Sequence, residues 1–142
     1  MHPSRVHNLP PRAGVDPISD ADSAFITVSM AVGRPLRHET IALLADDARR
    51  GVALVVVNGT SRPDDVVEVL EFLTHPSAHG GRVGSIALAT VRPGGRSDAS
   101  DIDRWLEMSD LAEQSGIELL EWFVIGRDVT CPRDLLGEPP RW

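Results

Sequence analysis

Residues 89–103, ATVRPGGRSDASDID, bring together residue types that could do chemistry. An apolar run ends there, the chain turns at a proline and two glycines, and serine and aspartate residues then begin a helix. The segment has the outline of a metal site, but it contains neither of the common zinc ligands histidine and cysteine. A structural role is also available, because the Ser-x-x-Asp spacing of Ser100 and Asp103 predicts that Ser100 caps the helix by accepting the Asp103 amide.

Anion binding is a second chemistry open to the same segment. Backbone amides at Gly94 and Gly95 and the guanidinium groups of Arg92 and Arg96 could together hold a small anion. Two glycines without a Gly-x-Gly-x-x-Gly or Lys-Ser/Thr pattern are a weak phosphate motif, and they first predict a tight turn.

Histidine and cysteine side chains lie elsewhere in the chain. His75 and His79 could bind a metal if they lay on one helical turn, but Pro76 and the glycines that follow predict a loop over residues 75–82. Cys131 has no evident base partner, so the sequence does not indicate a cysteine nucleophile.

A strand and a helix on either side of the turn would position these groups. Residues 83–91 are a continuous apolar run that predicts a buried strand, and residues 97–116 have the spacing of an amphipathic helix. Residues 39–46 fit either a helix or a strand. The other expected elements are strands at 24–31, 52–59 and 117–126 and a helix at 61–76. This order predicts a single α/β domain, with a mixed sheet flanked by two main helices.

The same patterns predict which side chains are buried. The run at 52–59 is of the kind that is covered on both faces of a sheet. Phe72 and Leu106 are expected on the apolar faces of their helices. Trp122 and Phe123 alternate along a strand, so one of them should face outward or toward a partner.

Composition limits the function classes. The 142 residues suit one domain, and the apolar content of 42% is enough for a core. The net charge of −7 argues against nucleic-acid binding, and all 14 basic residues are arginine, which excludes chemistry on a lysine amine. A single cysteine and the lack of an apolar stretch of membrane-spanning length predict a cytoplasmic protein with no membrane contact. We expect a flexible arm at 1–23, the domain at 24–137 and a short tail at 138–142.

The order and spacing of these segments resemble the JAB/MPN domain, in the RadC-like branch of bacterial proteins. Enzymes of that family carry the JAMM zinc motif, which is an early glutamate, then His-x-His-Pro at a strand end, then a serine and an aspartate three residues apart. Pro93 falls on the proline of the motif, and Ser100 and Asp103 fall on its serine and aspartate. Glu39 falls on the glutamate.

Flanking segments extend the resemblance over roughly residues 36–137. GIELLEWFVIG at 116–126 resembles the strand that follows the motif, and NGT at 58–60 resembles the family's RGT before its first long helix. The resemblance implies a JAB/MPN-like, that is cytidine-deaminase-like, fold and favours a strand at 39–46.

The sequence departs from the family at the zinc ligands. The two histidine positions of the motif hold Thr90 and Arg92. Threonine is a poor zinc ligand, and a guanidinium has no lone pair to donate. Catalytic zinc generally needs three protein ligands, of which only Asp103 remains. We therefore expect Arg92 to occupy the metal position and to pair with Asp103 or Glu39.

The resemblance implies a catalytically inactive, metal-free domain without cofactor, which acts through a protein partner or through self-association. The alternative is a divergent zinc metallo-isopeptidase or peptidase. It would take its metal through Asp103, Glu39 and a histidine outside the motif, such as His75 or His79.

Overall fold

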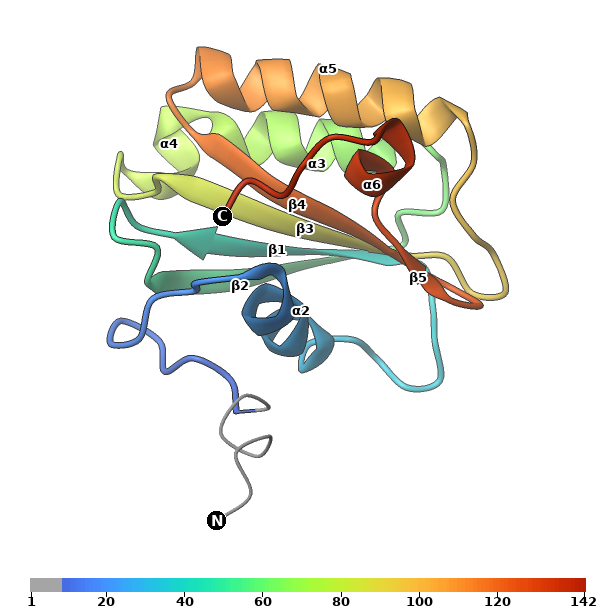
Figure 1. Ribbon diagram of the computed structural model, residues 1–142, viewed down its shortest axis with the longest axis horizontal. Helices are drawn as coiled ribbons and strands as arrows, with labels where there is room; N and C mark the ends of the chain where they lie inside the picture. The colour runs from blue at the N-terminus through green and yellow to red at the C-terminus, as the bar shows by residue number, and fades with distance from the viewer. Residues whose placement is uncertain (1–8) are drawn as a thin grey trace.

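The computed structural model describes residues 9–142, which form one five-stranded mixed sheet with helices on both faces (Figure 1). The strand order is β2-β1-β3-β4-β5, in which β3 and β4 are parallel and the other neighbours are antiparallel. The strands are β1 (Glu39–Ala45), β2 (Gly51–Asn58), β3 (Ser85–Val91), β4 (Glu118–Ile125) and β5 (Val129–Thr130). The predicted α/β class with a mixed sheet is confirmed.

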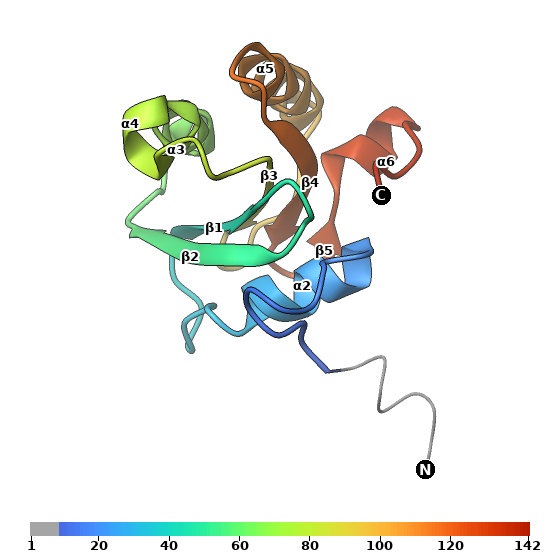
Figure 2. The ribbon, with the colours of Figure 1, turned by 90° about the vertical axis from the view of Figure 1, so that its left-hand side faces the viewer.

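Two long helices cover one face of the sheet and a shorter helix covers the other (Figures 1 and 2). The long pair are the two expected main helices, whereas the short helix was not predicted. The helices of residues 9–142 are α2 (Ala21–Ser29), α3 (Asp65–Thr74), α4 (Pro76–His79), α5 (Ser100–Gln114) and α6 (Pro132–Leu136). Of these, α3 and α5 form the long pair, and α2 covers the opposite face.

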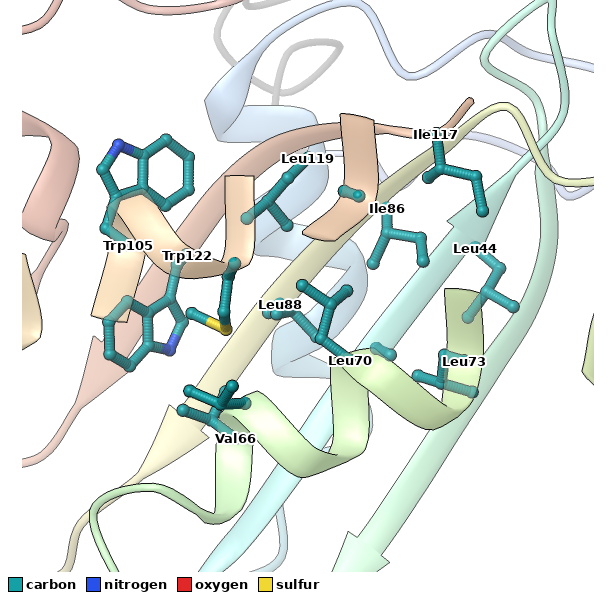
Figure 3. Packing of buried hydrophobic residues seen from close by; sticks show 14 of the residues in the cluster. Leu44, Val66, Leu70, Leu73, Ile86, Leu88, Trp105, Ile117, Leu119 and Trp122 are labelled. Carbon is teal, nitrogen blue, oxygen red and sulfur yellow. The ribbon is translucent and has the colours of Figure 1, made fainter. Parts of the chain in front are cut away.

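Strands β1 and β3 lie at the centre of the sheet and are buried on both faces. Because successive side chains of a strand point to opposite faces, these strands supply two separate cores. Figure 3 shows the larger core, a single cluster that contains Leu44, Ile86 and Leu88 of the strands, Leu70 of α3 and Trp105 of α5. The smaller core places Ile41, Leu43, Ala87 and Ala89 against α2.

The strand predicted at 24–31 is wrong, because this segment belongs to α2. Asp20 caps the helix by accepting the Ser23 amide, and Ala24, Thr27 and Val28 then bury one helical face. Residues 39–46, which fitted either state, form β1. A place between two partner strands gives this apolar segment hydrogen bonds along both edges.

The prediction that 52–59 is covered on both faces is also wrong. β2 is an edge strand, and Val52, Leu54 and Val56 are exposed by 42%, 39% and 42%. An apolar run in the sequence indicates a hydrophobic strand, but it does not indicate whether that strand lies at the centre or at the edge of the sheet. Phe72 and Leu106 lie beside the buried stripes of their helices and are exposed by 69% and 43%.

Segments at both ends of the described chain contact the rest of the domain. Residues 1–8 of the predicted arm lie outside the described part, but Pro17 forms a bridge with Arg50, and Ile18 is buried. At the C-terminus, Arg141 donates to Ser109 and to the Leu119 carbonyl. The loop expected at 75–82 contains the single turn of α4.

Trp122 and Phe123 are both buried, so neither faces outward as predicted. Trp122 packs in the core beneath α3 and α5, and Phe123 packs in the core beside α2. Helices on both faces of the sheet cover the two alternating sides of β4.

Candidate functional site

The candidate site lies where β3 ends and α5 begins. Because β3 and β4 are parallel, their carboxyl ends meet at one edge, where ligand sites of α/β sheets commonly lie. Thr90, Arg92 and Trp122 reach this edge from the strands, and Asp101 reaches it from the first turn of α5.

Arg92 and Asp101 form a bidentate ion pair. Arg92 Nη1 donates to Asp101 Oδ2 at 2.6 Å, and Arg92 Nη2 donates to Asp101 Oδ1 at 2.8 Å. The Asp101 side chain is fully buried, and that of Arg92 is 15% exposed. Such paired, charged hydrogen bonds are among the strongest in proteins. The predicted Arg92 partners, Asp103 and Glu39, are therefore wrong, although a carboxylate does hold the guanidinium.

A second arginine and a backbone amide also bind Asp101. Arg104 Nη1 donates to Asp101 Oδ1 at 2.8 Å, and the Asp98 amide donates to Asp101 Oδ2 at 2.9 Å. Burial opposes ionisation of Asp101, but the bonds from Arg92, Asp98 and Arg104 outweigh it, so the pKa of this carboxyl is lowered. Arg104 also donates to Asp64, which precedes α3, and so links the starts of the two long helices.

The hydroxyl of Thr90 is already engaged within the core. It accepts a hydrogen bond from Trp122 Nε1 at 2.9 Å. The Arg92 guanidinium lies 5.9 Å from the centroid of the Trp122 ring, within the range of a cation–π contact. In the next strand, Thr40 lies opposite Thr90 and shares a 2.9 Å hydrogen bond with Thr60.

Glu39 lies on the other face of the sheet, away from Thr90. It belongs to the odd-numbered side of β1, with Ile41, and faces α2. Its buried carboxylate accepts the Gly33 amide at 2.8 Å and Arg37 Nε at 3.4 Å. The structure thus does not bring Glu39 to the position that the resemblance assigned to it.

Ser100 and Asp103 are both exposed, and the predicted cap is wrong. Helix α5 begins at Ser100, its N-cap residue is Ala99, and no side chain makes a capping hydrogen bond. Asp101 is the residue of this turn that faces inward, because its burial is compensated by two arginines.

The histidines of the alternative zinc site lie away from this edge. His75 is the N-cap residue and His79 the last residue of the short helix α4, which follows the C-terminal end of α3. His75 Nδ1 hydrogen-bonds Ser77, and His79 Nδ1 accepts the Gly81 amide. Within residues 9–142, no three histidine, cysteine, aspartate or glutamate side chains lie close enough together to hold a metal ion.

The segment considered as an anion site is folded on itself. The Gly95 amide donates to the Arg92 carbonyl at 2.8 Å, so this amide closes a turn. Arg127 Nε donates to the Gly94 carbonyl, while the Arg92 guanidinium is held by Asp101 and the Arg96 carbonyl. Arg96 itself is exposed. The turn that the glycines predicted is thus the observed arrangement.

A second buried ion pair lies under the C-terminal helix α6. Glu121 is fully buried in β4, and its Oε2 accepts Arg133 Nε at 2.8 Å. Burial and the charge of Glu121 together raise the pKa of Cys131 to about 12, so this thiol is protonated at neutral pH. Sequence reasoning missed both Glu121 and Asp101. The signal for Glu121 was a lone charge in the middle of an apolar strand, which requires a buried partner.

No protein-family model matches the sequence, and no curated protein is significantly similar to it. None of the helices in the described chain has the length and apolar character needed to cross a membrane. A function for this chain must therefore be inferred from the geometry of the strand end.

Proposed function

We propose that the chain is a metal-free JAB/MPN-type domain of the RadC-like branch, which acts through protein contacts and not through catalysis. The observation that carries the proposal is the bidentate pair of Arg92 and Asp101 at the end of β3. In the resembling enzymes, a zinc-binding histidine occupies the position of Arg92.

The element order supports the family assignment. Strands β1 and β2, helix α3, strand β3, helix α5 and strand β4 follow in the sequence order that the resemblance requires. The turn after β3 and the start of α5 also meet at one edge, as the JAMM motif needs.

The chemistry at this edge disfavours the zinc hydrolase alternative. Arg92 cannot donate a lone pair to a metal, and its charge would repel a cation. The Thr90 hydroxyl accepts from Trp122, Asp103 faces solvent, and Glu39 lies on the opposite face of the sheet. The set Glu39, Asp103 and either His75 or His79 therefore does not converge on one point.

An interaction role follows from the proposed assignment, because members of this fold that lack the motif generally act as scaffolding or dimerising partners. The acidic net charge favours a protein partner over a nucleic acid. The lone, half-buried Cys131 fits the reducing cytoplasm that we propose as its location.

Zinc analysis of the purified protein without a histidine tag tests the assignment. We expect well under one zinc ion per chain, and the same content in an Asp103→Ala variant. Near-stoichiometric zinc that disappears on mutation of Asp103 would overturn the proposal.

A gain-of-binding experiment tests the origin of the site. The double variant Thr90→His/Arg92→His restores the motif histidines and removes the Arg92 contacts from the Asp101 carboxylate, which Arg104 and the Asp98 amide still bind. It is expected to bind zinc, whereas the matched variant Thr90→Ala/Arg92→Ala is not. If both double variants stay equally metal-free, the strand end does not derive from a zinc site.

A further inference from the structure

The outer edge of β2 is open over most of its length. β2 ends the strand order, and Figure 2 shows it along the rim of the sheet, with α3 on one side and α2 on the other. Residues 14–18 cover only its beginning, where the Gly14 amide donates to the Gly51 carbonyl at 3.1 Å. From residue 52 to 58, no strand of the described chain pairs with this edge.

Three residues of this edge point their backbone groups outward. The Gly59 amide donates to the His38 carbonyl at 2.9 Å, so these two residues form a hydrogen-bonded pair of the β1–β2 ladder. Hydrogen-bonded and non-hydrogen-bonded pairs alternate in an antiparallel ladder. The amides and carbonyls of Leu54, Val56 and Asn58 therefore point away from β1.

The edge lacks the usual protection against pairing with another strand. Edge strands of monomeric proteins commonly carry charges or prolines, or are covered. Residues 52–58 read VALVVVN and contain neither a charge nor a proline. Val52, Leu54 and Val56 are exposed on the side of α2, and Phe72 is exposed on the side of α3.

Two grooves run beside the strand, one on each face of the sheet. A groove of about 250 Å³ lies between β2 and the segment before α2, and one of about 420 Å³ lies between β2 and α3. Without the five buried lining residues, the strand and the two grooves present 16 partly or fully exposed residues, which is fewer than one side of a standard interface has and fits a weak dimer. A single extended peptide would occupy the hydrogen-bonding edge without covering both groove walls.

We infer that β2 pairs with β2 of a second copy of this chain, antiparallel and with the two-fold axis at Val56. This register is self-complementary, because Leu54 of each copy lies opposite Asn58 of the other. It uses all three outward-pointing residues and stays clear of the edge that residues 14–18 cover. The two sheets then form one continuous sheet, with both α3 helices on the same face.

This dimer supplies a surface for the interaction role proposed above and rests on that role, but not on the zinc assignment. A zinc-free protein that stays monomeric would leave the metal-free assignment intact and reject the dimer. A zinc-containing dimer would reject the metal-free assignment and leave the inferred dimer intact.

Sedimentation velocity across about 1 to 200 µM protein tests the pairing. An interface below the standard size fits a weak, reversible dimer, for which we expect a dissociation constant on the order of 10 µM. Val56→Lys places two charges at the two-fold axis and should weaken the dimer at least about tenfold. Leu106→Lys is the matched control, because Leu106 is 43% exposed on α5 and Val56 is 42% exposed on β2.

Disulfide cross-linking tests the register. Val56→Cys brings two thiols together at the axis, where Cα atoms of a hydrogen-bonded pair are about 5.5 Å apart, a spacing that suits a disulfide. Leu54→Cys lies on the same face with similar exposure, but its two copies would be about 14 Å apart. We expect oxidation at pH 8 to link the first variant and not the second, while the protonated Cys131 thiol stays unreactive.

Three results would overturn the inference. They are a wild-type monomer at the highest concentration, equal dimerisation of the Val56→Lys and Leu106→Lys variants, and equal cross-linking of the two cysteine variants. A monomer that captures an extended segment of a different protein along β2 would also reject it, because the second copy would then not be the occupant.

Discussion

Arg92 is a permanent cation at the end of a buried strand, and its charge is matched within the fold. Asp101 accepts hydrogen bonds from both terminal nitrogens of the Arg92 guanidinium, and the Trp122 ring lies next to this guanidinium. The pair removes both charges from water, so its net contribution to stability is small relative to an apolar replacement. Loss of one partner is different, because it leaves the other buried charge with fewer compensating contacts.

The Arg92→Ala variant is expected to lose about 3 kcal/mol of unfolding free energy at neutral pH. Arg104 still binds Asp101 in this variant, which keeps the loss from being larger. Urea denaturation measures the change, and Arg96→Ala is the control, since this exposed arginine should change stability by less than about 0.5 kcal/mol. Equal stability of Arg92→Ala and wild type would contradict a structural role for the pair.

Acid should weaken the same site, because the pKa of Asp101 is lowered in the folded protein from its ordinary value of 3.8. A carboxyl of this kind stabilises the fold fully above its unfolded pKa, and that stabilisation disappears as the pH falls through the folded pKa. Between about pH 5 and pH 2, the unfolding free energy of wild type should therefore fall more steeply than that of Asp101→Asn. Parallel curves for the two proteins would show that Asp101 does not titrate in this way.

At the scale of elements, the turn after β3 and the turn after β4 pack backbone to backbone. A Cβ atom built on Gly126 would collide with the carbonyl oxygens of Gly95 and Arg92. The Arg127 amide donates to the Gly95 carbonyl at 2.9 Å, so the two turns cannot move apart without losing this hydrogen bond.

Gly126→Ala should destabilise the protein by about 2 kcal/mol or more, because backbone atoms cannot move aside as a flexible side chain can. Gly51→Ala is the matched control, since a Cβ there meets only ordinary contacts, the nearest at 3.8 Å from Leu43. Thermal denaturation compares the two variants. A Gly126→Ala protein that melts with the control would show that the turns are not tightly packed.

At the scale of the whole molecule, pairing through β2 couples stability to concentration. A dimer that dissociates on unfolding is stabilised by mass action, so its melting temperature rises with protein concentration. We expect this rise for wild type between about 5 and 500 µM and a smaller rise for Val56→Lys, because its dimer is at least about tenfold weaker. Calorimetry at several concentrations measures it, and a concentration-independent melting temperature in both proteins would speak against the dimer.

Local patterns in the sequence were sufficient for much of the fold. The apolar run at 83–91 and the amphipathic spacing at 97–116 predicted β3 and α5, because strands and helices repeat with different periods. The order of these elements predicted the mixed α/β class. The capping of α2 by Asp20 was also present in the sequence, but the β-branched residues of 24–31 outweighed it in the prediction.

What only the tertiary structure decided is which groups meet. β2 and β3 are equally apolar in sequence, yet one lies at the edge and the other at the centre, because strand order depends on contacts between distant segments. Glu39 was assigned to the site by spacing, but its parity in β1 turns it to the other face. Arg92 was expected to find a carboxylate, and the fold provides Asp101, because the first turn of α5 points that side chain at the strand end. The sequence determined the local elements and the need of Arg92 for a carboxylate, whereas packing determined which carboxylate it contacts.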